Sequence, residues 1–204
     1  MKKNNPLNSS FRASDAIVEA IRQCLSNQKI VVVSLDGGSG AGKTTLAIEV
    51  ASQVDATIIH CDDFFDATIS NAEWETASLE KRCCRCIDWS RLQKEVLYPL
   101  INGETVYYHP FSFENRDGLS SEIVEVNPTQ VIILDGIYSS LLNLFEVGQL
   151  KILVDVVPDL RYKRHNQREG TDDLEWHQLW DSVEEYYFTF LRPPETFDLI
   201  VQNA

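Results

Sequence analysis

A glycine-rich stretch carries the residues with the clearest chemical potential. Gly37, Gly42, Lys43 and Thr44 occupy the fixed places of the pattern G-x-x-x-x-G-K-[ST]. Glycines let a backbone turn around an anion with its N–H groups pointing inward, and a helix beginning at Lys43 would add the positive end of its dipole. Lys43 would reach the β- and γ-phosphates, and the Thr44 hydroxyl would bind Mg²⁺. The stretch predicts a nucleoside-triphosphate site made by Gly37, Gly38, Ser39, Gly40, Ala41, Gly42, Lys43, Thr44 and Thr45.

The surroundings of this stretch decide between two kinds of nucleotide site. The dinucleotide pattern G-x-G-x-x-G fails, because Lys43 stands where the third glycine would follow Gly38 and Gly40. A β-branched apolar run at 30–33 predicts a strand before the turn, and apolar side chains at helical spacing predict a helix after it. This order favours a triphosphate site over an accidental match.

Acidic residues stand at the ends of three predicted strands. They are Asp36, Asp62 with its neighbour Asp63, and Asp135. The carboxyl ends of parallel strands meet at one edge of a sheet, so these acids would open onto the face that holds phosphate. A carboxylate there can accept the proton of an attacking hydroxyl and help hold Mg²⁺. We expect Asp62 to be this base and a metal ligand, with Asp135 in the outer Mg²⁺ sphere. The alternative is that both acids only cap helices.

Three arginines recur at spacings of three and four. Arg161, Arg164 and Arg168 would lie on one face of a helix that follows a predicted strand. Such a helix can close over a polyphosphate and exclude water, so we expect residues 160–172 to form a lid whose arginines bind the nucleotide. An ordinary solvated helix face would explain the same spacing.

The cysteines and a histidine have simpler interpretations. Cys83 and Cys86 form a C-x-x-C spacing, but a zinc site needs a second ligand pair and only Cys24 and Cys61 remain. The context of a thioredoxin-like redox motif is also missing, which favours packing. His109 stands beside two tyrosines and is as compatible with packing as with function.

The predicted elements alternate between strands and helices. Continuous apolar runs predict buried strands at 30–35, 57–61, 131–136, 152–157 and 197–201. Helical patterns cover 15–27, 43–54, 71–86, 90–102 and 172–190, and short strands at 105–109 and 123–126 predict a hairpin. This order is typical of an α/β fold with a doubly wound, parallel five-stranded sheet, a small hairpin insertion and an Arg-rich lid. We expect residues 1–204 to form a single domain with its ligand crevice at the carboxyl ends of the strands.

Capping residues predict where two of these helices begin. Ser14 or Asp15 would cap the first helix, and Ser90 with Gln93 would form a capping box at the fourth. Pro99 would kink the end of the fourth helix, and Gly103 would terminate it.

Composition excludes several classes of protein. The chain has 204 residues, 44% of them hydrophobic, and a formal charge of −13. Such an acidic protein is a poor match for nucleic acid or an anionic membrane, and no apolar run is long enough to span a bilayer. The basic residues at the N-terminus lack the apolar segment of a signal peptide, and five cysteines fit reduced intracellular thiols. We expect a cytoplasmic protein with a small-molecule substrate.

Several motifs match those of one family. Residues 37–45 resemble its phosphate-binding loop, and residues 62–65 resemble its D-[SD]-F-[FY] segment. Asp88, followed by Trp89 and by residues 97–103, is similar to a segment whose aspartate grips sugar hydroxyls. Residues 134–137 resemble its E-G-[IL] motif with Asp135 in place of glutamate, and the arginine run resembles its lid. The family is the uridine kinase-like branch of the P-loop kinases, which also holds nicotinamide riboside kinases and phosphoribulokinase relatives.

This resemblance implies an ATP- and Mg²⁺-dependent kinase that phosphorylates a hydroxyl of a nucleoside-like or related polyol acceptor. It implies that Asp62 is the catalytic base beside Lys43. We expect the acceptor to bind the hairpin region at 104–127 through Asp63, Asp88, His109 and Arg116. Uridine kinases read base and ribose with a stretch of the form P-x-Y-D-F-x-x-H-x-R, whereas residues 109–116 here are shorter and lack its Tyr, its Asp and its internal His, although Arg116 stands at the position of its Arg. The identity of the acceptor therefore stays open.

Two other functions compete with this one. A nucleoside-monophosphate kinase would need more basic residues around the acceptor pocket. A nucleotide-dependent switch would bind the triphosphate without an acceptor, although the guanine signature N-K-x-D of GTPases is missing from the sequence.

Overall fold

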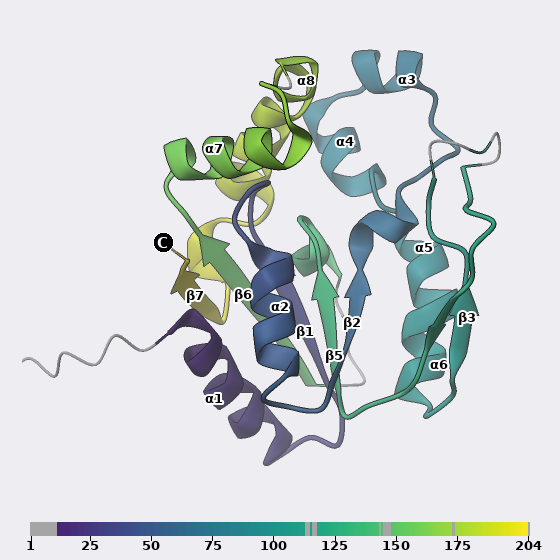
Figure 1. Ribbon diagram of the computed structural model, residues 1–204, viewed down its shortest axis with the longest axis vertical. Helices are drawn as coiled ribbons and strands as arrows, with labels where there is room; N and C mark the ends of the chain where they lie inside the picture. The colour runs from purple at the N-terminus through teal and green to yellow at the C-terminus, as the bar shows by residue number, and fades with distance from the viewer. Residues whose placement is uncertain are drawn as a thin grey trace, which may run out of the picture.

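A five-stranded parallel sheet forms the centre of the protein, whose computed structural model describes residues 12–112, 115, 118–142, 144, 148–172 and 174–203. Its strand order is β2-β5-β1-β6-β7 (Figure 1). The strands are β1 (Val31–Asp36), β2 (Ala56–His60), β5 (Val131–Asp135), β6 (Gly148–Asp155) and β7 (Leu199–Gln202). Every neighbouring pair in this sheet is parallel, so the predicted fold class is confirmed.

Both faces of the sheet are buried, and successive side chains point to opposite faces. On β1, Val31 and Val33 belong to the core packed against α1 (Ala13–Leu25) and α2 (Lys43–Ala51), whereas Val32 belongs to the core on the other face. A strand that is covered on both sides needs apolar residues at every position. This explains why the strands read as continuous apolar runs in the sequence.

The segment between β2 and the hairpin divides into more helices than the sequence predicts. It contains η1 (Cys61–Phe64), α3 (Asn71–Thr76), α4 (Leu79–Arg85), α5 (Trp89–Leu92), η2 (Gln93–Leu97) and α6 (Tyr98–Ile101). The predicted helix at 71–86 is two helices, because Ser70 makes a capping box with Glu73 and Ser78 caps a second start. The π-helical η2 comes just before Pro99, which has no N–H to continue the helical ladder. Gly103, with φ of 82°, ends the helix as predicted.

Two predicted helix caps are wrong. The α1 helix begins at Ala13 with Arg12 as its N-cap, and Ser14 lies buried inside it. The α5 helix is capped by Asp88, whose side chain accepts a hydrogen bond from the Arg91 N–H, so Ser90 is already helical. An aspartate two residues earlier offers the same capping chemistry, and the sequence pattern alone did not separate the two.

The hairpin and the C-terminal helices complete the fold. The strands β3 (Val106–Tyr108) and β4 (Val124–Val126) pair antiparallel, as predicted, and bury Val106 and Tyr108 against the main core. After β6 come α7 (Pro158–Glu169), α8 (Leu174–Tyr186), the π-helical η4 (Tyr187–Leu191) and the short η5 (Pro194–Thr196); a further turn, η3 (Ser139–Leu141), follows β5. In Figure 1, α7 and α8 lie across the carboxyl ends of the strands.

The strand register brings the predicted acids to one edge. Asp135 is paired with Leu35 of β1 and with His60 of β2, so the three strands end at the same level. The residues that follow these strands therefore meet above the sheet, where the sequence predicted a ligand crevice.

The part of the chain that the structure describes contains no helix with the length and apolar character needed to cross a membrane. All five cysteines are free thiols, and the described residues contain no group of three or more histidine, cysteine or acidic side chains that could hold a metal ion. Cys83 and Cys86 are buried, which supports the packing interpretation of the C-x-x-C spacing.

Candidate active site

The glycine-rich loop connects β1 to α2 at the carboxyl edge of the sheet. Gly42 has a φ of 80° and serves as the N-cap of α2, a conformation that favours glycine. The Lys43 Nζ donates hydrogen bonds to the carbonyl oxygens of Gly37 at 2.8 Å and Gly38 at 3.1 Å. The ammonium group therefore lies against the opening residues of the loop, and the exposed Thr44 and Thr45 stand at the positive end of the α2 dipole.

Asp36 anchors the start of this loop. Its carboxylate is fully buried and accepts four hydrogen bonds, from the N–H groups of Gly37, Tyr138 and Ser140 and from the Tyr187 hydroxyl at 2.6 Å. Burial raises the pKa of Asp36, and the hydrogen bonds oppose that rise. Tyr138 adopts a φ of 69° to reach it, in the left-handed region that few non-glycine residues occupy. Asp36 thus joins the loop, β5 and the η4 turn.

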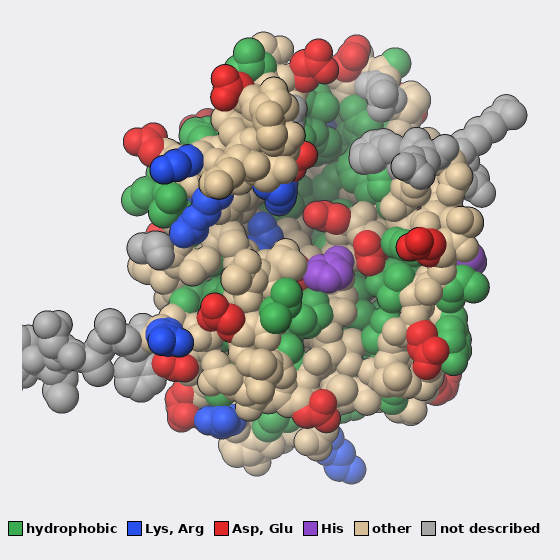
Figure 2. All heavy atoms as spheres, in the orientation of Figure 1, with side chains coloured by type: hydrophobic (Ala, Val, Ile, Leu, Met, Phe, Trp, Pro, Cys, Tyr) green, Lys and Arg blue, Asp and Glu red, His purple; other side chains and the backbone are tan. Residues whose placement is uncertain are grey.

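Asp62 is an exposed residue of η1 at the carboxyl edge of the sheet, where a cleft opens above the strands (Figure 2). Its carboxylate makes no hydrogen bond with a described residue, and it is accessible to solvent from the open side of the cleft. Desolvation by the surrounding protein raises the pKa of Asp62, with Asp135 adding to the rise and Lys43 and Arg168 opposing it. The structure thus brings Asp62, Lys43, Asp135 and Arg168 within electrostatic reach of one another.

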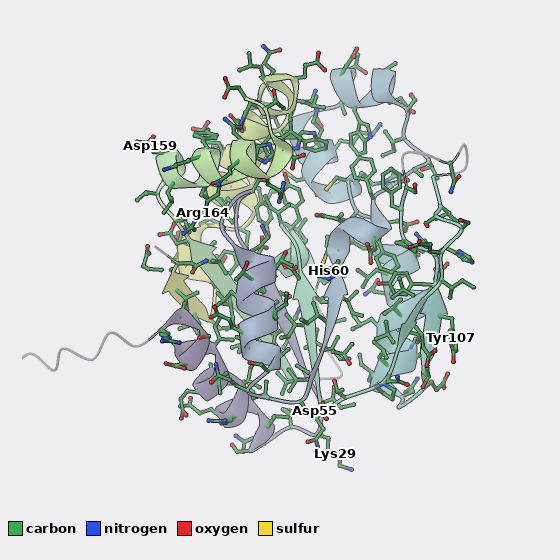
Figure 3. The ribbon with its side chains drawn as sticks, viewed as in Figure 1. Lys29, Asp55, His60, Tyr107, Asp159 and Arg164 are labelled. Atoms are coloured by element: carbon green, nitrogen blue, oxygen red, sulfur yellow. The ribbon has the colours of Figure 1, made fainter. Side chains whose placement is uncertain are left out.

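Asp135 and His60 form a hydrogen-bonded pair at the tips of β5 and β2. The His60 Nδ1 lies 3.0 Å from the Asp135 Oδ2, and the Asp135 side chain is only 3% exposed. The hydrogen bond to Asp135 raises the pKa of His60. Figure 3 shows His60 at the carboxyl end of β2. Sequence reasoning missed His60, although its position directly before Cys61 and Asp62 could have drawn attention to it.

The chemistry of the donor set fits a magnesium ion. Mg²⁺ prefers oxygen ligands, and Asp62 and Asp135 supply carboxylates while Thr44 supplies a hydroxyl. Neither the Thr44 hydroxyl nor the Asp62 carboxylate has a hydrogen-bond partner among the described residues, so both oxygens are available. Asp36 is unsuited to this role because its four hydrogen bonds occupy both carboxylate oxygens.

The lid arginines make different contacts although they share α7. The Arg161 Nη1 donates to the Ser39 carbonyl at 3.1 Å and to Glu184 at 2.8 Å. The Arg164 Nη1 donates to the Asn203 carbonyl at 2.9 Å, and the Asn203 side chain donates to the Ala41 carbonyl. The α7 helix therefore lies directly on the glycine-rich loop. We call the loop (residues 37–44) with α7 and α8 the loop wall of the cleft.

The opposite side, which we call the acceptor wall, consists of η1, α5 and the β3–β4 hairpin. Asp63 accepts a 2.7 Å hydrogen bond from the Tyr108 hydroxyl, and Arg91 lies over the Phe64 ring at 4.9 Å from its centroid. Asp88 is engaged as the α5 cap. These contacts fix Asp63 to the hairpin, and Asp88 has one oxygen committed to the backbone.

The structure does not place the other two residues predicted to bind the acceptor, His109 and Arg116, at the cleft. The exposed His109 has its Nδ1 2.9 Å from the Ser120 carbonyl, so it ties the two sides of the hairpin together. Arg116 lies outside the described residues. The roles of both in acceptor binding stay predictions.

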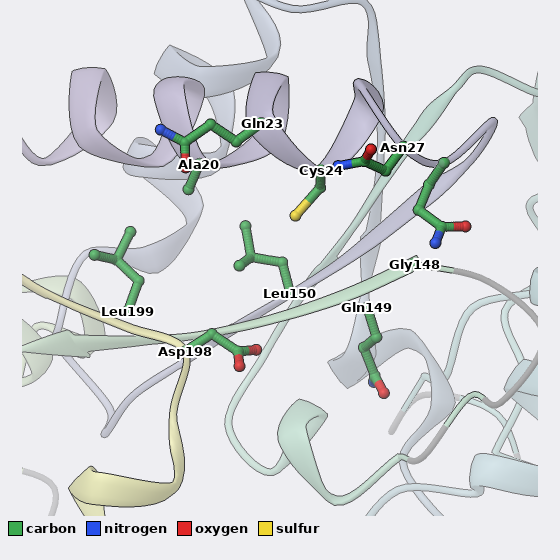
Figure 4. Close-up of a pocket in the computed structure, with 10 residues that line it drawn as sticks. Ala20, Gln23, Cys24, Asn27, Gly148, Gln149, Leu150, Asp198 and Leu199 are labelled. Atoms are coloured by element: carbon green, nitrogen blue, oxygen red, sulfur yellow. The ribbon is translucent and has the colours of Figure 1, made fainter.

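The molecular surface agrees with this placement of the cleft. Figure 2 shows that the face above the tips of β2 and β5 is hollowed, and acidic and basic side chains gather around the hollow. A separate pocket of about 580 Å³ lies at the amino ends of β6 and β7, beside α1 (Figure 4). It contains none of the predicted site residues; its lining includes Cys24, Gln149 and Asp198. The position of the loop and the acids, and not this pocket, identifies the candidate active site.

The sequence matches the Phosphoribulokinase / Uridine kinase family over residues 32–202. The chain belongs to this family. Two curated uridine kinases illustrate the similarity. The protein of Halalkalibacterium halodurans is 30% identical over 174 residues, covering 80% of this chain and 77% of that protein. The protein of Halobacterium salinarum is 27% identical over 164 residues, covering 79% and 71%.

A solved structure shares the architecture of this phosphoribulokinase/uridine kinase family member. The structure of a possible uridine kinase from Bacillus stearothermophilus covers 92% of this chain and 96% of its own, with a TM-score of 0.65 and 16% identity. At that identity the likeness shows the fold alone. Family membership and fold together support a nucleotide-binding, small-molecule kinase.

Proposed function

We propose that the protein transfers the γ-phosphate of ATP to a hydroxyl group of an uncharged, nucleoside-like or related polyol acceptor. The loop amides and Lys43 hold the phosphates, and Thr44, Asp62 and Asp135 hold Mg²⁺. Mg²⁺, when bound, neutralises charge on the phosphates. The hydroxyl oxygen of the acceptor bonds to the γ-phosphorus while Asp62 accepts the hydroxyl proton. The bond between the γ-phosphorus and the ADP oxygen breaks, and ADP leaves.

One observation carries the proposal: a carboxylate without a hydrogen-bond partner in the described part of the chain lies within electrostatic reach of the loop lysine. The structural carboxylate of Asp36 is saturated with donors, whereas Asp62 has no hydrogen-bond partner among the described residues and its surroundings raise its pKa. A base needs this combination of an accessible oxygen and a pKa shifted toward neutrality.

The charges of the acceptor wall favour a neutral acceptor over a nucleoside monophosphate. Asp62, Asp63 and Asp88 contribute three carboxylates there, and Arg91, the arginine in the described part of that wall, is already paired with Glu95. Arg85, in the neighbouring helix α4, is paired with Asp66. A phosphate-bearing acceptor would meet uncompensated negative charge. We infer that the hairpin at 104–127 and the acids bind hydroxyl groups.

An acceptor screen tests the function. Wild-type protein is incubated with Mg-ATP and each member of a panel of nucleosides, sugars and their monophosphates, and ADP and the phosphorylated product are measured together. We expect ADP to form in step with a phosphate monoester of a neutral hydroxyl compound. Phosphorylation of monophosphates alone would favour the nucleoside-monophosphate kinase, and ATP hydrolysis that no acceptor accelerates would favour the switch.

A further inference from the structure

Ser39, in the middle of the glycine-rich loop, is held by three side chains from the helices above it. Its N–H donates to Glu184 Oε1 at 2.8 Å, and its carbonyl accepts from the Arg161 Nη1 at 3.1 Å. Its hydroxyl lies 2.8 Å from the Nδ1 of His165. Glu184 and His165 are 6% and 2% exposed, so these contacts are shielded from water. The arrangement fixes the loop to both α7 and α8.

The α7 helix packs closely against the glycines of the loop. A Cβ added at Gly38 would lie 1.8 Å from the Arg161 Nη1 and 2.7 Å from the Glu184 Oε2. A Cβ at Gly40 would lie 2.1 Å from the Arg161 carbonyl oxygen. Glycine at Gly40 is therefore required by the α7 backbone as well as by its φ of 75°, whereas a side chain at position 38 would displace the Arg161 guanidinium.

Part of the Arg161 guanidinium is not engaged in hydrogen bonds with the described residues. Its Nη1 is fixed by Ser39 and Glu184, while its Nε and Nη2 have no partner in the described part of the chain. The same Gly38 that contacts Arg161 also accepts a hydrogen bond from the Lys43 Nζ. Lys43, to which the proposed function assigns the β- and γ-phosphates, and Arg161 therefore lie on either side of the same loop residue, and the free N–H groups of Arg161 are within reach of a phosphate held there.

We infer that Glu184 is a positioning residue that holds Arg161 ready for the γ-phosphate and so sets the preference of the site for ATP over ADP. This inference rests on the proposed function. An arginine held in one geometry before its ligand arrives loses less freedom on binding. Glu184 also places a negative charge near the phosphates. If charge repulsion were its only effect, removing that charge would strengthen ATP binding.

The test compares Glu184→Gln with Glu185→Gln, which removes the same charge from the exposed neighbouring position of α8. Dissociation constants for Mg-ATP and Mg-ADP are measured by calorimetry, with the thermal midpoint as a check on folding. We expect Glu184→Gln to lower the ADP-to-ATP ratio of dissociation constants roughly five- to tenfold, and Glu185→Gln to leave it unchanged. An unchanged or increased ratio in Glu184→Gln would overturn the inference.

A second pair of variants shows whether Glu184 acts through Arg161. Arg161→Lys keeps the charge but loses the planar fork, and we expect the same fall in the ratio. When Arg161→Gln is already present, adding Glu184→Gln should not lower the ADP-to-ATP ratio of dissociation constants any further. The inference would be contradicted if the two substitutions lowered the ratio additively in the double variant. An unaltered ratio in Arg161→Lys would also contradict it, and this variant can be measured even where Glu184→Gln is too unstable. If the wild type bound neither nucleotide, the proposed function would fail instead.

Discussion

The two walls of the cleft hold their functional groups in opposite ways. On the loop wall, backbone carbonyls and carboxylates already occupy the cations: Lys43 contacts Gly37 and Gly38, and Arg161 contacts Glu184. On the acceptor wall, Asp62 has an unpaired carboxylate, and Asp63 is held by a single tyrosine hydroxyl. The cations of the loop wall are therefore held in place by protein groups, whereas Asp62 on the acceptor wall keeps its oxygens available. This difference is what a kinase needs if its phosphate donor is fixed and its acceptor is oriented by a few hydrogen bonds.

The largest expected effect comes from breaking the support of the loop wall. Asp36→Asn turns an amide NH₂ toward N–H and O–H donors that all require an acceptor, so buried groups lose their partners. We expect a loss of roughly 2–4 kcal/mol in the free energy of unfolding, measured by urea denaturation. Asp55→Asn is the control, because Asp55 is exposed and lies far from the cleft (Figure 3). It should change the free energy of unfolding by less than about 0.5 kcal/mol. Equal stability of the two variants would show that the Asp36 network does not support the loop.

A smaller effect is expected on the acceptor wall. Tyr108→Phe removes the hydroxyl that orients Asp63, so the KM for the acceptor should rise by about three- to tenfold while the KM for Mg-ATP is unchanged. Tyr107→Phe is the matched control, because Tyr107 is 62% exposed on the other face of the same strand. Steady-state kinetics with both substrates varied measure the two constants. A parallel change in both KM values would mean that the walls are not independent.

The smallest expected effect is a shift in pH dependence. Arg168 lowers the pKa of Asp62, so removing its charge raises that pKa, and the acidic limb of the pH–rate profile moves to higher pH in Arg168→Gln. Arg164→Gln should leave this limb in place, because Arg164 contacts Asn203 and does not contribute to the Asp62 shift. A shift toward lower pH in Arg168→Gln would contradict the assignment of the limb to Asp62.

The local features of the loop wall could be predicted from the sequence. Fixed glycine and lysine positions and apolar runs on either side are enough to place the loop between β1 and α2, because the determining residues are neighbours in the chain. The helical pattern at 172–190 was also predicted; within it Val183 and Tyr187 are buried in the core, and the Trp176 ring lies 4.3 Å from that of His165 between centroids.

The contacts that join distant segments could not be predicted in this way. Glu184 meets Ser39 across 145 positions, and Tyr187 meets Asp36 across 151. No periodicity or motif in the sequence links such pairs, since they depend on how α7 and α8 dock. Asp36 was recognised as an acid at a strand end, but only the structure shows that donors surround it. The roles of Asp62, Asp88, His109 and the lid arginines in catalysis and binding stay predictions.

The most direct test of the account is a single-turnover measurement of phosphoryl transfer by Asp62→Asn, using an acceptor found in the screen and saturating Mg-ATP. Asparagine keeps the shape of the side chain but cannot accept the proton, so we expect transfer to slow by at least about 100-fold even at Mg-ATP concentrations that saturate the variant. Transfer at close to the wild-type rate would show that Asp62 is not the base and would contradict the central claim.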